Sequence, residues 1–300
     1  MDMRINQQDR AAPDTESRPS HLLDQWSIEV MPRTAAKITD FRPLLPSGTR
    51  IYIAHIDGTP LEDMVATAKR LHREGFPVMP HIPARSLSNR AELEDLLNRY
   101  RNEADVRQAL LLAGGNSSPR GTLSSSIDLI ETGLFDVMGF TDLHVAGHPE
   151  GNRDIDRDGL TAGIDAALLT KQAYAQRTDA RIAITTQFAF DAAGVTTWAE
   201  RIAALGVTLP IHVGIAGPAK IQTLIKYALS CGVGPSLKIL QKRALDVTRL
   251  LVPYEPTDLV SALGQYKQKN PQSLIERVHL FPLGGIEPAA LWAKRESRGR

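Results

Sequence analysis

Residues 26–34 read Trp26-Ser27-Ile28-Glu29-Val30-Met31-Pro32-Arg33-Thr34. Apolar residues at near-alternating positions predict a buried strand, which Pro32 ends. Glu29 is unusual there, because an ionised carboxylate on a buried strand costs free energy unless a partner or a site holds it. Two interpretations stay open. Glu29 is either a structural residue paired with Arg33 or another base, or an acid of raised pKa at the end of a strand that delivers a proton near neutral pH.

Outward from this stretch, short apolar runs alternate with amphipathic segments along the whole chain. The runs that predict strands are 26–30, 50–55, 77–82, 108–113, 136–147, 181–186, 210–213 and 277–281. The segments that predict helices are 35–41, 60–74, 89–103, 124–131, 156–177, 196–205, 218–230 and 256–270. This alternation predicts parallel strand pairing, and eight units favour a closed (β/α)8 TIM barrel over an open sheet.

The domain organisation follows from composition along the chain. Residues 1–25 are polar, charged and interrupted by proline, which predicts a flexible N-terminal arm. Residues 26–300 show neither a fixed-period repeat nor a low-complexity tract. We therefore expect one barrel domain, the catalytic domain, after the arm.

The overall charge and the cysteine content limit the classes of partner. Lys and Arg total 35 and Asp and Glu 34, so the net charge of +1 provides no general attraction for nucleic acid or an anionic membrane. We expect a small-molecule partner; homo-oligomer formation stays open. The single cysteine, Cys231, excludes an internal disulfide framework and suits a reducing cytosol. No apolar segment approaches the ~20 residues of a membrane span, and no leader is visible, so a soluble cytoplasmic protein is expected.

In such a barrel the functional site gathers at the carboxyl ends of the strands. His81 sits in a rigid frame between prolines, and is either a site residue or a structural histidine. Gly114-Gly115 either lets a ligand approach the backbone or forms a plain turn, and it lacks the spacing of a dinucleotide fingerprint. Gln187 offers a donor and an acceptor to a heterocycle such as a pterin, or closes a loop hydrogen bond.

Two further patterns do not indicate a binding site. His144 and His148 are four residues apart, which on an extended segment places them roughly 13 Å from each other, too far to share a metal. No metal site is predicted. The string Asp142-Leu143-His144-Val145-Ala146-Gly147 resembles part of a cobalamin-binding signature, but the later elements of that signature do not follow, so we interpret it as coincidence.

Taken in order, several motifs resemble the methylenetetrahydrofolate reductase family. Ile28-Glu29-Val30-Met31-Pro32-Arg33-Thr34 is similar to the family's Glu-Phe-Phe-Pro-Pro-Arg-Thr opening, and Met79-Pro80-His81 to its Pro-His strand end. The segments 145–150, 184–191 and 213–215 resemble its Ala-Ala-Tyr-Pro-Glu, Thr-Gln-Phe-Phe-Phe-Asp and Pro-Gly-Ile motifs. The matches are colinear from residue 26 to about 281, so the order makes the set fairly specific.

The resemblance implies a (β/α)8 barrel that passes a hydride from NADH or NADPH through FAD to 5,10-methylenetetrahydrofolate, in one-carbon metabolism. It implies that Glu29 is the catalytic general acid that protonates the folate. The substrate-binding residues that it implies are Gln187, Phe190, Ile221 and Phe281. The cofactor-binding residues are His81, Ala113, Gly114, Gly115, His148 and Lys171, with Lys171 near the phosphates of FAD.

Four residues in three segments depart from the family pattern. Ala113-Gly114-Gly115 stands where the family has Arg-Gly-Asp, His148 replaces a tyrosine, and Ile221 replaces a phenylalanine. Because these residues surround the flavin and the folate, two alternatives stay open beside the FAD enzyme. One is a flavin-free reductase with direct hydride transfer from the nicotinamide, and the other is a non-catalytic folate-binding accessory subunit. Gly115 also raises the hypothesis of a reaction that runs in the oxidative direction.

Overall fold

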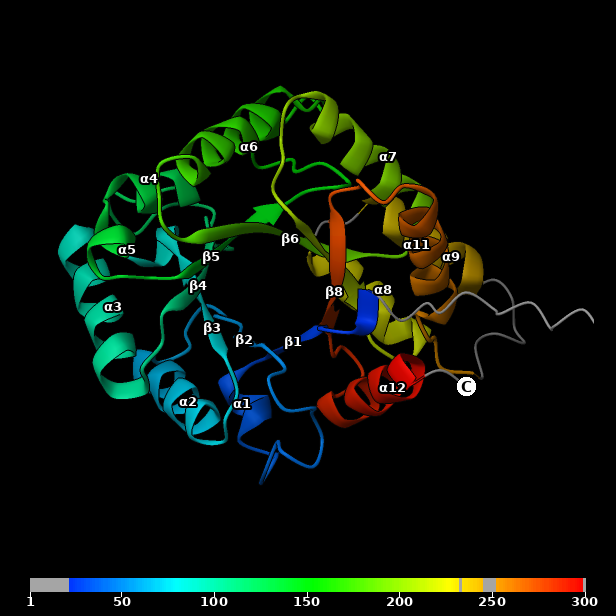
Figure 1. Cartoon of the computed structure of the whole chain (residues 1–300), viewed down its shortest axis with the longest axis horizontal. Helices are drawn as coiled ribbons and strands as arrows, with labels where there is room; N and C mark the ends of the chain where they lie inside the picture. Colours follow the sequence, from blue (N-terminus) through cyan, green and yellow to red (C-terminus); the bar gives the residue numbers. More distant parts are fainter. Residues whose placement is uncertain (1–21, 232–233, 245–251, 299–300) are drawn as a thin grey trace, which may run out of the picture.

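The computed structural model describes residues 22–231, 234–244 and 252–298. Eight parallel strands close into a barrel in sequence order, and β8 pairs with β1. The expected (β/α)8 TIM barrel is confirmed, with the helices forming an outer ring (Figure 1). The strands are β1 Ser27–Val30, β2 Ile51–Ile53, β3 Val78–Pro83, β4 Gln108–Leu112, β5 Asp142–Gly147, β6 Arg181–Ala189, β7 Ile211–Ala216 and β8 Ile275–Phe281.

The helices occupy the segments between strands. They are α1 Pro32–Ala35, α2 Leu61–Arg73, the 3₁₀ helix η2 Ala84–Ser86, α3 Arg90–Ala104, α4 Ser126–Glu131, α5 Leu134–Val137, α6 Ala162–Ala175, α7 Ala192–Ala204, α8 Ile221–Ser230, α9 Gly234–Ala244, α11 Thr257–Lys269 and α12 Ile286–Arg298. Of these, η2, α5, α9 and α12 are additional to the expected helices. The helix expected at 35–41 is instead the short α1, which starts at Pro32 because proline suits a first helical position.

The expected strand over 136–147 is wrong in its first half. Residues 134–137 form α5, and β5 begins only at Asp142. Gly133 and Gly139, both with φ of 68°, start and end this helical turn. Phe135 and Phe140 then pack edge to face across it. The apolar residues of this segment therefore serve a helical turn and not a strand.

The C-terminal helix α12 is absent from the expected elements. Its buried residues Ile286, Ala289, Ala290 and Ala293 recur at the spacing of one helix face. Trp292 is fully buried and donates a hydrogen bond to Thr257 Oγ1 on α11 at 3.1 Å. The helix thereby covers β8 and β1, where the barrel closes (Figure 1).

The packed part of the chain starts before Trp26. Residues 1–21 of the expected arm lie outside the described residues. Leu22 and Leu23 fall within the expected arm of residues 1–25. Both are buried and belong to the main hydrophobic cluster together with Trp26. The domain therefore includes at least these residues.

The strands divide the buried side chains into two sets by their period-2 alternation. Ile28, Ile51, Leu143, Ile184 and Leu280 belong to the large cluster between strands and helices. Their neighbours along the strands point into the barrel, where Tyr52 contacts His144 and Thr185 from strands that are not adjacent to β2. The interior is therefore unusually polar for this fold, in which branched apolar side chains dominate.

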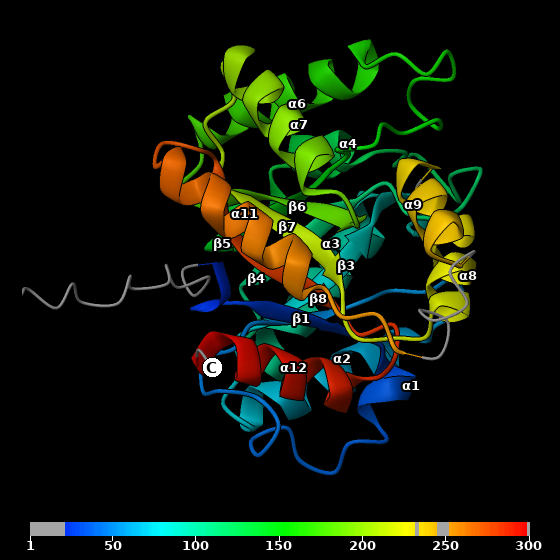
Figure 2. The ribbon, with the colours of Figure 1, turned by 90° about the vertical axis from the view of Figure 1, so that its right-hand side faces the viewer.

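Helices α1, α8 and α9 lie at the end of the barrel where the strands finish (Figure 2). Tyr227 of α8 and Cys231 just after it line the same cavity as the strand-end residues. Ser236 of α9 donates its backbone N–H at 3.1 Å and its hydroxyl to the carboxylate of Glu150, in the loop after β5. This contact holds α9 against the loop after β5.

Within residues 22–231, 234–244 and 252–298, no helix is both long enough and apolar enough to cross a bilayer.

Candidate active site

A cavity of about 570 Å³ opens at the carboxyl ends of the strands, within the range of about 300–1,000 Å³ found for small-molecule sites. Among the described lining residues, Glu29 is the one carboxylate and Lys37 the one lysine or arginine. Apolar and aromatic side chains make up much of the wall. The polar lining residues include Glu29, Thr34, Lys37, His55, His81, His148, Thr185, Thr186, Gln187 and His279.

Glu29 lies on β1 between two imidazoles from different strands. Its Oε2 is 3.2 Å from His81 Nε2 on β3 and 3.8 Å from His279 Nε2 on β8. Neither nitrogen has another hydrogen-bond partner among the described residues. The Glu29 side chain is 18% exposed, so a ligand in the cavity can reach it. Arg33, the first partner considered for a structural role of Glu29, lines a different groove. The basic partners that the structure gives Glu29 are His81 and His279.

The protonation state of Glu29 differs from the hypothesis drawn from sequence. Burial by itself raises the pKa of Glu29, but the charge of His81 and the approach of both imidazoles outweigh burial and lower the pKa to about 2. The expectation of a raised pKa is therefore wrong for the ligand-free protein. Glu29 is ionised and ready to accept a proton.

The second ring nitrogen of His279, which does not face Glu29, also has a hydrogen-bond partner. Ser27 Oγ lies 2.9 Å from His279 Nδ1, and the imidazole is fully buried. Burial lowers the pKa of His279, although Glu29 opposes this shift. Ser27, His279 and Glu29 thus form a connected group at the floor of the cavity.

His148 and Lys171 lie together at the end of β5 and on α6. Burial, followed by the nearby charge of Lys171, lowers the pKa of His148 to about 4, so the imidazole is neutral. Burial also lowers the pKa of Lys171 to about 8. His148 lines the mouth cavity, whereas Lys171 does not.

Gln187 and Phe281 both line the cavity, as expected for substrate-binding residues. Gln187 Oε1 accepts a 3.3 Å hydrogen bond from the backbone N–H of Phe188, which is the loop contact considered above. Phe281 packs edge to face on Phe188 and His279. The amide nitrogen of Gln187 has no hydrogen bond within the described part of the chain and is available to a ligand.

The other expected substrate residues lie elsewhere. Phe190 packs on Phe188 and Tyr254 and lines a separate small pocket. Ile221 is buried at the start of α8. Neither residue lines the mouth cavity, so the expected stacking of Ile221 on a ligand has no counterpart in this conformation.

The residues expected to bind FAD do not share one cavity. His81 and His148 line the mouth, while Ala113, Gly114, Gly115 and Lys171 do not. Gly114 is packed against Pro83, since a Cβ there would meet Pro83 Cβ at 3.0 Å. Arg85 also holds this loop, through its N–H to Ala113 O and its guanidinium to Asn116 O. In this conformation the set therefore does not fit FAD.

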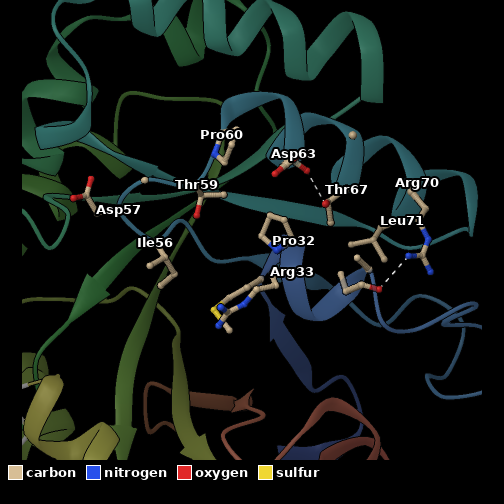
Figure 3. Close-up of a pocket in the computed structure, with 15 residues that line it drawn as sticks. Pro32, Arg33, Ile56, Asp57, Thr59, Pro60, Asp63, Thr67, Arg70 and Leu71 are labelled. Atoms are coloured by element: carbon tan, nitrogen blue, oxygen red, sulfur yellow. Dashed lines mark hydrogen bonds between the residues drawn. The ribbon is translucent and has the colours of Figure 1, made fainter.

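A second groove of about 670 Å³ lies outside the barrel between α1 and α2. Figure 3 shows Arg33 and Pro32 on one side and Thr59, Pro60 and Asp63 on the other. Arg70 is already bound, because its guanidinium pairs with Glu74 and donates to Ala35 O. The groove shares Met31 and Ile56 with the mouth cavity. It has no cluster of catalytic groups comparable to the one around Glu29.

Sequence reasoning missed several residues of the mouth. Ser27 and His279 lie two residues from Glu29 and Phe281, respectively, on the same face of their strands. Strand periodicity could therefore have placed them in the barrel. Lys37, which also lines the cavity, follows α1 without a pattern that distinguishes it. His55, another lining residue, ends the expected strand 50–55, so the strand-end rule could have found it.

His144 is buried inside the barrel and contacts Tyr52 and Arg50, whereas His148 lines the mouth cavity. Within the described ranges, no three His, Cys, Asp or Glu side chains gather as metal ligands would.

No family model matches this chain. Among solved structures, it is similar to an uncharacterized protein from Clostridium thermocellum that binds two copies of 5-methyl-5,6,7,8-tetrahydrofolic acid. The TM-score is 0.59 at 12% sequence identity, and the match covers 90% of this chain and 94% of the other. At this identity the similarity shows a common fold.

Proposed function

We propose that the mouth cavity binds a reduced folate, and that the protein is a methylenetetrahydrofolate reductase-type oxidoreductase. The observation that carries the proposal is the position of Glu29, the one carboxylate among the described lining residues, between His81 and His279. The colinear motifs support it. So does the similar fold of a protein that binds 5-methyltetrahydrofolate.

The ionised state of Glu29 favours the oxidative direction. When 5-methyltetrahydrofolate loses a hydride from its methyl carbon, N5 and that carbon form an iminium. N10 then bonds to this carbon and loses its proton, which the Glu29 carboxylate accepts. In the reverse direction Glu29 must first gain the proton that opens the ring at N10. The same side chain serves both directions, as microscopic reversibility requires.

The hydride acceptor defines two versions of the proposal. FAD is the acceptor that the family resemblance implies, and it would supply two-electron redox chemistry beside His81 and His148. The alternative is direct transfer between folate and a nicotinamide co-substrate, NAD(P)+ in the oxidative direction. This alternative is favoured because the residues assigned to FAD do not share one cavity.

The colour of the purified protein separates the two versions. A flavoprotein absorbs in the flavin bands and releases FAD stoichiometrically on denaturation. The direct-transfer enzyme is colourless and turns over with folate and nicotinamide alone. Stoichiometric flavin in the active protein would remove the alternative.

The decisive experiment compares Glu29→Gln with wild type in anaerobic assays in both directions. Because general acid–base catalysis contributes about 10²–10⁴-fold, we expect kcat to fall by at least about 100-fold while the reduced folate still binds. Glu94→Gln, on an exposed residue of α3, is the matched control and should retain full activity.

The remaining hypothesis is a non-catalytic folate-binding subunit. It predicts that wild type binds folate tightly and turns over in neither direction with either nicotinamide. Undiminished turnover of Glu29→Gln would refute the catalytic role of Glu29 itself.

A further inference from the structure

Strand β6 carries an extra residue where it reaches the mouth cavity. Thr185 is paired with His212 and Phe188 with Gly214, so three steps along β6 face two steps along β7. One extra residue on one strand is the pattern of a β-bulge. Side chains of a regular strand alternate between its two faces. Residues 185–188 nevertheless all line the mouth cavity, so the bulge brings consecutive residues of β6 to it.

The hydroxyl of Thr186 replaces a backbone partner at this bulge. Its Oγ1 accepts a 2.8 Å hydrogen bond from the backbone N–H of Gly214 and donates at 2.9 Å to the carbonyl oxygen of Gln187. Thr186 is only 1% exposed. Without the hydroxyl, the buried N–H of Gly214 would lose its partner, which costs free energy because no water replaces it.

Gly214 is needed because the two strands approach closely at the bulge. A Cβ at this position would lie 2.4 Å from the carbonyl oxygen of Thr186 and 2.7 Å from that of Gln187. These are backbone atoms, which cannot move aside as the end of a flexible side chain can. The glycine, the bulge and the threonine hydroxyl therefore together fix the backbone at Gln187.

The neighbouring backbone also orients the amide of Gln187. Its Oε1 accepts a 3.3 Å hydrogen bond from the N–H of Phe188. With the amide reversed, its NH2 group would face that N–H, and two donors would meet. The NH2 group has no partner among the described residues and is left for the cavity that Gln187 lines. At this position the site therefore offers a hydrogen-bond donor.

We propose that Thr186 is a positioning residue that holds the amide of Gln187 with its NH2 group toward the cavity, so that this part of the site selects ligands with a hydrogen-bond acceptor. The identity of the ligand rests on the proposed function, since a pterin presents its C4 carbonyl oxygen as such an acceptor. The orientation of the amide does not depend on that function. The hydroxyl of Thr186 is directed at the backbone of β6 and β7, so its effect on a ligand passes through Gln187.

The first test measures binding of 5-methyltetrahydrofolate by anaerobic isothermal titration. Thr186→Val keeps the branched shape but lacks the hydroxyl, so we expect Kd to rise about three- to tenfold, the effect of losing one neutral hydrogen bond. Thr186→Ser keeps the hydroxyl and should bind nearly as tightly as wild type. Thr170→Val, the same change on an exposed threonine of α6, is the control and should leave Kd unchanged. Unchanged binding by Thr186→Val would overturn the proposal.

A double-mutant cycle shows whether Thr186 acts through Gln187. Gln187→Met keeps the length of the side chain and removes its NH2 group. In that background, Thr186→Val should raise Kd by less than about twofold, because the hydrogen bond that it disturbs is already absent. A threonine that merely supports the cavity would give additive losses, and this result would count against the proposal.

Nuclear magnetic resonance of wild type provides a second measurement should Thr186→Val not fold. In protein with isotopically labelled glutamine, the spectrum of Gln187→Met identifies the side-chain NH2 signal of Gln187. This signal should shift when 5-methyltetrahydrofolate is added, since the NH2 group gains an acceptor. A signal that stays in place at saturating ligand would contradict the proposal.

Amide hydrogen exchange separates this proposal from the proposed function. Exchange of the Gly214 N–H should accelerate about tenfold in Thr186→Val and stay unchanged in Thr186→Ser, whatever the ligand. If wild type bound no reduced folate, the proposed function would fail, while exchange at Gly214 would still decide the role of Thr186. Normal folate binding with equal protection of Gly214 in all three proteins would instead refute the role of Thr186 and leave the proposed function standing.

Discussion

At the scale of single residues, Glu29 is controlled by what lies around it in space. Two imidazoles from β3 and β8 face one carboxylate. Their effect exceeds the cost of burial and lowers the pKa of Glu29 to about 2. A carboxylate of lowered pKa contributes its full stabilisation to the folded state above its ordinary pKa of about 4.5, and loses it as the pH falls toward the folded-state pKa of about 2.

This stabilisation should disappear on acidification. As the pH falls from 4.5 toward 2, the unfolded chain binds the proton before the folded state does, so the free energy of unfolding decreases. We expect wild type to lose more stability than Glu29→Gln over this range. Urea unfolding of both proteins at pH 5, 4 and 3 measures the difference. If the free energy of unfolding fell equally with pH in both proteins, the pKa of Glu29 would not be lowered by folding.

Lys37 is the other residue for which the cavity makes a definite prediction. A reduced folate carries carboxylates on its glutamate tail, and Lys37 is the lysine or arginine among the described lining residues. In the proposed complex, with the pterin near Glu29, we expect the tail to lie toward this cation. Lys37→Ala should weaken binding of 5-methyltetrahydrofolate about two- to fivefold, the size of an exposed ion pair.

A tetrahydropterin without the tail is the matched ligand for this experiment. Its affinity should be the same for wild type and Lys37→Ala in isothermal titration. Equal losses for both ligands would indicate that Lys37 supports the cavity and does not recognise the tail.

At the scale of elements, Glu150 joins the loop after β5 to α9. The carboxylate accepts the backbone N–H and the hydroxyl of Ser236 in the first turn of α9. An acidic group at a helix N-terminus also interacts favourably with the helix dipole. The segment after β5 therefore contributes His148 to the lining of the mouth cavity and Glu150 to the contact with α9.

Glu150→Ala should release α9 locally. Losing hydrogen bonds to a charged group costs about 1.5–3 kcal/mol each, so amide hydrogen exchange in α9 should accelerate by at least about tenfold. Exchange in α2, on the other side of the molecule, should stay unchanged. Glu103→Ala, which removes an exposed pair with Arg99, is the control. Equal protection of α9 in both variants would show that other contacts hold the helix.

At the scale of the whole molecule, the barrel depends on bringing its ends together. β8 pairs with β1, and α12 packs over this seam through Trp292. Removing a buried aromatic side chain costs about 3–5 kcal/mol. Trp292→Ala should therefore reduce the free energy of urea unfolding by this amount. Trp292→Phe, which keeps most of the packing, should cost less than half as much.

Hydrogen exchange distinguishes a local effect of Trp292→Ala on α12 from an effect on the whole barrel. If hydrogen exchange in Trp292→Ala increased in α12 while global unfolding stayed unchanged, the helix would be an independent appendage. We expect instead that β1 and β8 lose protection together with α12, since they share the seam.

The sequence alone was sufficient for the fold and for the rim of the site. Apolar runs and amphipathic segments are local patterns, so they predicted the eight strands and the closed barrel. The rule that sites gather at strand ends placed Glu29, His81, His148 and Gln187 at the cavity, and the family resemblance added Phe281; all five line it. Errors arose where a local pattern was ambiguous, as in the helical turn of α5 and the unpredicted α12.

The tertiary structure alone decided what Glu29 can do. Ser27 and His279 are 252 residues apart in sequence and 2.9 Å apart in space. Electrostatic interactions depend on distance in space, so the lowered pKa of Glu29 cannot be derived from one-dimensional patterns. The sequence determined where a carboxylate would stand, and the closed barrel determined which side chains surround it and hence that it is ionised.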